Sequence, residues 1–209
     1  MLKSWDDLDY WDSSDWIKVQ EKLDVLDRRG IRYNPSRHNI FNSLDAVPCE
    51  QARVVLVGQD PYPSAVYATG FAYSIPATNY NFPPTLHNMY TEYTRDLGYP
   101  YPTHGNLSKW VDQGVVLWNA IPTCLSGQSR SHDWPEWAAL TREIVEKIPA
   151  VFVFMGAVAN RFAEFVPPNR LADVVITAHP ANRFKQFKGC RLFSTINSKL
   201  VHPIDWKLT

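Results

Sequence analysis

The stretch VVLVGQDPYP, residues 54–63, decides how the chain is expected to fold. Its four leading residues are apolar and mostly β-branched, which is typical of a strand buried on both faces within a parallel sheet. Polar Gln59 and Asp60 follow Gly58 directly and are confined by the prolines Pro61 and Pro63. Because proline fixes its own φ angle, the pattern predicts an amide and a carboxylate held rigidly at the carboxyl end of a buried strand.

Three further segments have the same short, continuous apolar character. They are GVVLWNA (114–120), AVFVFMG (150–156) and DVVITAHP (173–180). Helical segments are expected at 16–29, 85–98, 135–148, 160–165 and 194–201. This alternation predicts one α/β domain over residues 1–209, an α/β/α sandwich with a central, mostly parallel four-stranded sheet.

Charge is unevenly distributed along the chain, although its net charge is zero. Residues 1–30 contain eight acidic and five basic side chains, and we expect an acidic helical segment there. Residues 161–209 contain eight basic and three acidic side chains. Such a basic end suits either a polyanion, such as nucleic acid, or a solvated face.

The composition excludes several classes of protein. Hydrophobic residues make up 45% and charged residues 20% of the chain, as in an ordinary globular domain. The three cysteines, Cys49, Cys124 and Cys190, lack the spacing of a disulfide framework or a zinc site. Neither a signal peptide nor an apolar run of roughly 20 residues is recognisable, so we expect an intracellular, cytoplasmic protein with no membrane partner.

A polar or small group follows each predicted strand. Asp60 follows the first, Asn119 ends the second and His179 ends the fourth, whereas small residues follow the third. The carboxyl ends of parallel strands share one edge of the sheet, where open α/β sheets bind ligands. Taken singly, Asp60 also fits a helix N-cap and His179 a hydrogen-bonded loop residue. An unpaired amide at Asn119 would cost free energy, which favours a ligand there.

These side chains suit recognition and hydrolysis of a planar heterocycle. Asp60 is a candidate general base or electrostatic stabiliser, and His179 is a candidate for stabilising an anion. Asn119 offers a donor beside an acceptor, which matches an N–H next to a carbonyl, and Tyr62 and Tyr73 offer flat surfaces. The sequence contains no dinucleotide, P-loop, zinc-protease or serine-hydrolase motif, so neither a cofactor nor a metal is expected.

The order of these motifs resembles that of the family 1 uracil-DNA glycosylases. The match runs from about Tyr33 to Lys207. Its landmarks are VVLVGQDPYP, GFAYS, FPPTLHNMYTEY, HGNLSKWVDQGVVLWNAIPT, GQSRSH, HPANRF, GCRLFSTIN and PIDWKL. The resemblance implies a monofunctional, metal-independent hydrolase of base excision repair that flips uracil out of DNA, releases it and leaves an abasic site.

The resemblance assigns catalysis to two residues. Asp60 would position the attacking water and stabilise positive charge on the deoxyribose, and His179 would hydrogen-bond O2 of the departing uracil anion. Four residues would bind the base: Gln59 through its backbone, Tyr62 beside C5, Tyr73 by stacking in place of the usual phenylalanine, and Asn119 through O4 and N3–H, which discriminates against cytosine.

The resemblance also places three loops on the DNA. The DNA-binding residues that it implies are Pro83, Pro84, Thr85, Gln128, Ser131, His132, Ala181, Arg183, Phe184 and Lys185. The loop after His179 departs from the usual HPSPL, and either Arg183 or Phe184 replaces the leucine that wedges into the helix. Ala157 and Ala181 replace two phosphate-contacting serines, so we expect the enzyme to depend more on its basic residues for binding DNA.

The expected partner is uracil-containing DNA, single- or double-stranded, bound by a monomer. The phage protein that inhibits this family mimics DNA and encloses the wedging leucine, so weaker inhibition is expected here. Two alternatives remain open. One is a superfamily member with an altered preference for damaged bases, which would excise thymine or hypoxanthine. The other is a non-catalytic DNA-binding module with the same fold, which would bind DNA without releasing a base.

Overall fold

A central sheet of four parallel strands organises the computed structural model, which describes residues 2–184 and 186–208. The strands are β2 (Val54–Gly58), β3 (Val115–Asn119), β5 (Val151–Met155) and β6 (Val174–Thr177). They lie side by side in the order β3-β2-β5-β6. Every residue of β2, β3 and β5 is buried, as their continuous apolar sequences predict, whereas β6 at the edge is partly exposed.

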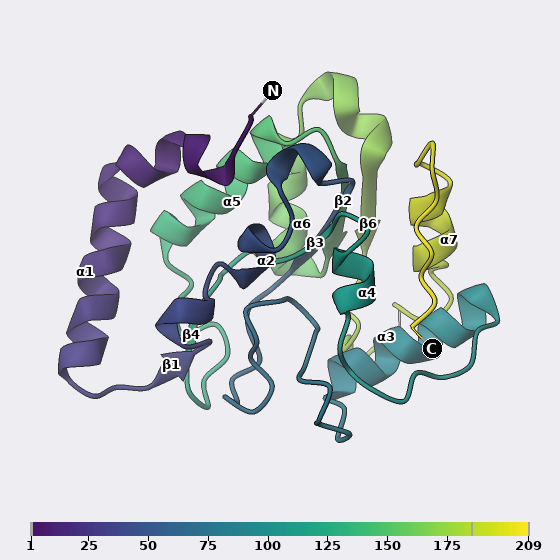
Figure 1. Ribbon diagram of the computed structural model, residues 1–209, viewed down its shortest axis with the longest axis horizontal. Helices are drawn as coiled ribbons and strands as arrows, with labels where there is room; N and C mark the ends of the chain where they lie inside the picture. The colour runs from purple at the N-terminus through teal and green to yellow at the C-terminus, as the bar shows by residue number, and fades with distance from the viewer. Residues whose placement is uncertain (1, 185, 209) are drawn as a thin grey trace.

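Helices cover both faces of this sheet (Figure 1). The α-helices are α1 (Ser14–Arg28), α2 (Asn42–Asp45), α3 (Pro84–Leu97), α4 (Ser108–Val111), α5 (Pro135–Lys147), α6 (Ala157–Asn160) and α7 (Leu192–Asn197). In Figure 1, α1 and α5 pack together on one side of the sheet, and α4 and α7 lie on the other. The predicted α/β/α sandwich with a four-stranded sheet is therefore confirmed.

Shorter elements connect this framework. Six 3₁₀ helices are found among the described residues: Trp5–Asp7, Asp9–Asp12, Arg37–Asn39, Cys49–Gln51, Arg161–Phe165 and Pro168–Asp173. Strand β1 (Tyr33–Asn34) pairs with β4 (Cys124–Leu125) in an antiparallel ribbon. The helix expected at 160–165 is a 3₁₀ helix that continues from α6. The helix expected at 194–201 ends earlier, because the Asn197 side chain bonds to the backbone of Ile204 and turns the chain.

The acidic N-terminal segment is built into the core. Its Trp5, Leu8 and Tyr10 side chains are buried, and α1 packs on α5. The carboxylate of Glu143 on α5 accepts hydrogen bonds from the backbone amides of Asp9 and Tyr10, at 2.7 and 2.8 Å. These contacts fasten the segment to the sandwich. Among the described residues, no helix combines the length and the apolar character needed to span a bilayer.

Candidate active site

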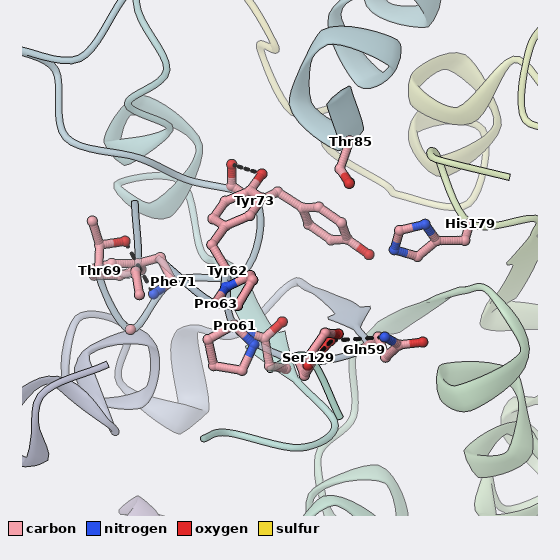
Figure 2. Close-up of a pocket in the computed structure, with 14 residues that line it drawn as sticks. Gln59, Pro61, Tyr62, Pro63, Thr69, Phe71, Tyr73, Thr85, Ser129 and His179 are labelled. Carbon is pink, nitrogen blue, oxygen red and sulfur yellow. Dashed lines mark hydrogen bonds between the residues drawn. The ribbon is translucent and has the colours of Figure 1, made fainter. Parts of the chain in front are cut away.

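A cavity of about 130 Å³ lies at the carboxyl edge of the sheet (Figure 2). It is bounded by the loop after β2, the end of β3, the start of α3 and the loop after β6. Among the residues that line it are all six that were expected to act on the base: Gln59, Asp60, Tyr62, Tyr73, Asn119 and His179. Residues from four distant parts of the sequence therefore face one small volume.

The carboxylate of Asp60 is fixed by three hydrogen bonds. Gln59 Nε2 donates to Oδ1 at 2.8 Å, and the Ser129 hydroxyl and Arg130 amide donate to Oδ2 at 2.8 and 2.6 Å. Residues 59–63 form a loop and not the start of a helix, so Asp60 is not an N-cap. Two of these donors were not identified from the sequence, although Ser129 and Arg130 lie within the GQSRSH motif.

His179 faces the cavity as a neutral imidazole. Its Nδ1 accepts a hydrogen bond from the backbone amide of Ala181 at 3.1 Å, which leaves the ring proton on Nε2. Burial lowers the pKa of His179, and the nearby charge of Asp60 offsets only part of this effect. Gly156 makes room for the residue, since a Cβ on Gly156 would lie 2.7 Å from the Cβ of His179.

Asn119 ends β3 directly opposite Gly58 of β2. The Asn119 side chain is 8% exposed, and its amide makes no hydrogen bond within the described part of the chain. A Cβ on Gly58 would lie 2.8 Å from Asn119 Oδ1 and 3.1 Å from the Tyr73 hydroxyl. Glycine at position 58 therefore lets the amide and the phenol approach the end of β2 closely.

The two tyrosines of the cavity are joined to each other. The Tyr62 hydroxyl donates to the carbonyl oxygen of Tyr73 at 3.1 Å, and the Tyr67 ring packs edge-on against Tyr62. Tyr73 has a φ angle of 66°, in the left-handed region that few non-glycine residues adopt. Burial raises the pKa of Tyr62 and of Tyr73, so both phenols keep their protons at neutral pH.

Comparison with known proteins identifies the family. Residues 45–201 match the family model described as the Uracil DNA glycosylase superfamily. The chain belongs to this superfamily. Uracil-DNA glycosylase of Acinetobacter baylyi is 38% identical over 191 residues, which cover 85% of this chain and 79% of that protein. Uracil-DNA glycosylase 2 of Listeria monocytogenes is 35% identical over 184 residues, which cover 83% and 82%.

A solved structure has the same fold. A point variant of mimivirus UNG in complex with UGI superposes with a TM-score of 0.84, over 96% of this chain and 87% of that chain, at 24% identity. The resemblance inferred from the motifs is thus confirmed at the level of family and fold. In the described residues of this glycosylase, no group of His, Cys, Asp and Glu side chains is arranged to hold a metal ion.

The segment Pro83–Pro84–Thr85 of the glycosylase begins α3 at the border of the cavity. Pro84 lies in the first turn of the helix, where a missing N–H leaves no hydrogen bond unmade. Pro83 is buried and Pro84 is exposed, whereas Thr85 lines the cavity itself. The segment therefore forms part of the border of the cavity.

One face of α3 holds the segment that follows His179. Asn88, Glu92 and Asp96 are spaced four residues apart and so project from the same side of the helix. Their hydrogen-bond partners are the Pro180 carbonyl at 2.9 Å, the Gly189 and Arg191 amides at 2.5 and 2.7 Å, and the Ser194 amide and hydroxyl at 2.8 and 2.5 Å. Glu92 is 1% exposed, so its two hydrogen bonds are largely shielded from water.

The tip of this segment presents two stacked side chains to solvent. The Arg183 guanidinium lies 4.7 Å from the centre of the Phe184 ring, and Phe184 is 67% exposed. Ala181 is also exposed and supplies the amide that holds His179. Lys185, which was expected to bind DNA, lies outside the described residues. Arg183 and Phe184 are therefore both exposed at the tip of the segment.

The GQSRSH loop donates hydrogen bonds to Asp60 and is stabilised by hydrogen bonds of its own Ser131. Gln128 is exposed, as a residue expected to contact DNA should be. The Ser131 hydroxyl instead bonds inside the loop, donating to the Gln128 carbonyl at 2.8 Å and accepting from the Leu125 amide at 2.6 Å. Ser131 therefore sets the shape of the loop that carries Ser129 and Arg130.

His132 requires a correction. It was expected to contact DNA, but its side chain is 2% exposed and stacks on Trp134 with ring centres 4.1 Å apart. Its Nδ1 lies 2.8 Å from the Thr123 hydroxyl. A motif of adjacent polar residues does not indicate which of them turn inward, and here the histidine supports the loop from the core.

Proposed function

We propose that this glycosylase hydrolyses the bond between uracil and deoxyribose in DNA, releasing free uracil and leaving an abasic site. The convergence of Asp60, Asn119 and His179 on one small cavity supports this reaction most strongly. The 38% and 35% identity to proteins named uracil-DNA glycosylase also supports it. Because the cavity is small, at about 130 Å³, a base pair within a duplex does not fit into it, and the base must leave the DNA stack to enter it.

Asn119 and the tyrosines select the base. The Asn119 amide donates from Nδ2 to O4 of uracil and accepts from N3–H at Oδ1, a pattern that cytosine cannot match in the same amide orientation. Tyr73 stacks on the base. Tyr62 fills the space beside C5 and excludes the methyl group of thymine, and its half-buried ring, tied to the Tyr73 backbone, supports that role.

His179 stabilises the leaving group. As the bond between C1′ of the deoxyribose and N1 of uracil breaks, its electron pair moves to the base and gives an anion with charge on O2. The Nε2–H of the neutral imidazole donates to that oxygen, since Nδ1 is occupied by the Ala181 amide. A donor fixed before the reaction costs no reorganisation during it.

Asp60 acts on the other side of the breaking bond. Its carboxylate stabilises the positive charge that develops on the sugar and orients a water toward C1′. The water oxygen bonds to C1′, and its proton is lost to the carboxylate or to solvent. The three hydrogen bonds donated to Asp60 support this role, because they hold the carboxylate group in one orientation.

We propose DNA contacts at Pro84 and Thr85 at the start of α3, at Gln128 in the GQSRSH loop, and at Ala181, Arg183 and Phe184 in the loop after His179, all of which are at least partly exposed. Lys185 is proposed from the sequence alone, and Pro83 is not among the contacts because it is buried. Either Arg183 or Phe184 fills the gap left by the flipped base. We propose that the protein acts inside the cell as a monomer on single- or double-stranded DNA. We also propose that the phage-type inhibitor binds it weakly, because the leucine which that inhibitor encloses is absent.

Release of free uracil from defined oligonucleotides tests the proposed reaction. The substrates contain one U:G pair, one U:A pair or one single-stranded uracil, and Asp60→Asn and His179→Ala are measured beside the wild type. We expect release from all three substrates and a loss of several orders of magnitude in both variants. DNA binding without any release by the wild type would contradict the proposal.

A further inference from the structure

The side chain of Tyr73 carries a hydroxyl without a partner into the base cavity. Tyr73 is 6% exposed, and its hydroxyl oxygen is buried and makes no hydrogen bond to any described residue. A buried hydroxyl that lacks a partner costs free energy, and such groups are uncommon in folded proteins. Its presence in a ligand site indicates a hydrogen bond that forms only when the ligand is bound.

The backbone fixes where this hydroxyl points. Tyr73 has a left-handed φ angle of 66°, and the Tyr62 hydroxyl holds its carbonyl oxygen. Figure 2 shows the Tyr73 ring extending across the cavity towards His179. The hydroxyl is therefore directed into the site by an anchored and unusual backbone conformation, which is a feature of functional positions.

Gly58 brings this hydroxyl and the Asn119 amide to the same place. The position of a Cβ on Gly58 is 3.1 Å from the Tyr73 hydroxyl and 2.8 Å from Asn119 Oδ1. Both groups therefore lie next to Gly58, and the described residues show no hydrogen bond between them. Hydrogen bonds in active sites often tighten only when the substrate is bound.

We propose that Tyr73 is a positioning residue for Asn119. When a pyrimidine fills the cavity, the Tyr73 hydroxyl donates to Asn119 Oδ1, and this bond directs Nδ2 towards O4 of uracil. Oδ1 keeps a second lone pair for N3–H. The inverted amide would match cytosine, so a fixed amide favours uracil. The proposal rests on the proposed uracil excision, because it concerns the same cavity.

The variant Tyr73→Phe removes only the hydroxyl, and Tyr10→Phe is its matched control. Tyr10 is 3% exposed, its hydroxyl also lacks a partner, and it lies in the 3₁₀ helix Asp9–Asp12, outside the cavity lining. We expect both variants to keep or raise the melting temperature, because each loses an unpaired buried group. Only Tyr73→Phe should slow single-turnover release of uracil, by about tenfold.

A double variant separates positioning from stacking. Because Tyr73 acts through Asn119, Tyr73→Phe should cause no further loss in an Asn119→Ala enzyme, whose residual release is measured at high enzyme excess. An equal loss in both backgrounds, or no loss in the wild-type background, would overturn the proposal. A lower melting temperature of Tyr73→Phe would also overturn it, since the hydroxyl would already be paired. Absence of release by the wild type would instead reject the proposed function, whatever the variants do.

Discussion

The hydroxyl of Ser129 donates to Oδ2 of Asp60 across 2.8 Å and thereby joins the loop after β4 to the loop after β2. The amide of Arg130 donates to the same oxygen at 2.6 Å. A carboxylate with a fixed orientation stabilises charge without reorganising during the reaction. The GQSRSH loop thus contributes to the proposed chemistry through Asp60, whether or not its other side chains touch DNA.

Ser129→Ala should lower the single-turnover rate of uracil release about fivefold. The variant removes one of three hydrogen bonds to Asp60, and a hydrogen bond of this kind contributes about 1 kcal/mol. Ser198→Ala is a matched control, because among the described residues its hydroxyl bonds only to the Thr195 carbonyl at the end of α7. A rate equal to that of the wild type would show that Asp60 is held well enough without Ser129.

Gly156→Ala should abolish most uracil release, with a loss of at least a hundredfold. The new Cβ would lie 2.7 Å from the Cβ of His179, so the histidine must move away from the cavity. Gly30→Ala controls for backbone strain, because Gly30, just after α1, also has a positive φ angle, and no atom of the described residues lies within 4 Å of its Cβ position. Equal losses of activity in the two variants would attribute the effect to strain and not to the displaced histidine.

Folding stability should fall as the pH drops from about 6.5 to about 4. Burial lowers the pKa of His132 to about 4, with a smaller contribution from Lys22. Histidine in the unfolded chain has a pKa of about 6.5. Between pH 6.5 and 4, His132 is therefore protonated in the unfolded chain but remains neutral in the folded protein. The contribution of neutral His132 to the free energy of unfolding is therefore fully present above pH 6.5. Near pH 4 the free energy of unfolding is lower by up to about 3 kcal/mol.

Urea unfolding at several pH values measures this effect. His132→Gln should reduce the slope of stability against pH between about 4 and 6.5, even if the variant is less stable at every pH. His38→Gln, at an exposed histidine, should leave the slope unchanged. The same slope in wild type and His132→Gln would show that other groups control the acid response.

Arg183→Ala and Phe184→Ala should separate charge from wedging at the loop tip. Arg183→Ala should remove one phosphate contact. The slope of log(kcat/KM) against the logarithm of the salt concentration should then become shallower by about 0.7 to 0.9. Phe184→Ala should lower activity on duplex DNA while leaving that slope unchanged. Measurements on a U:A duplex over a range of salt concentrations decide this, and a flat profile in the wild type would contradict dependence on charge.

Much of the fold follows from local sequence. The four β-branched runs predict the strands because a strand covered on both faces requires continuous apolar residues. The antiparallel pair β1 and β4 was missed, since each strand has only two residues and their pairing depends on contacts between distant parts of the chain. The 3₁₀ helix Arg161–Phe165 was expected to be helical, but its tighter winding is not encoded in periodicity over six residues.

The six cavity residues could be found because strand ends and family motifs point to the same edge of the sheet. Ser129 and Arg130 could not be assigned to Asp60, because about 70 residues separate them in sequence and only the fold brings them together. For His132, in contrast, a role was predicted from the sequence and was wrong. Its polarity suggested a surface role, whereas its burial depends on Trp134 and Thr123, which pack around it.

Helix α3 begins at the Pro83–Pro84–Thr85 segment and bonds, through Asn88, Glu92 and Asp96, to the segment that ends in Ser194. The Pro83–Pro84–Thr85 segment and the segment after His179, both proposed to contact DNA, are thus held by one helix. The length of that helix is set by a rise of about 1.5 Å per residue. Inserting one residue after Asn88 would turn Glu92 and Asp96 by about 100° away from their partners. The distance between these two segments is therefore set by the length of α3, and only insertions or deletions close to whole turns would keep both sets of contacts.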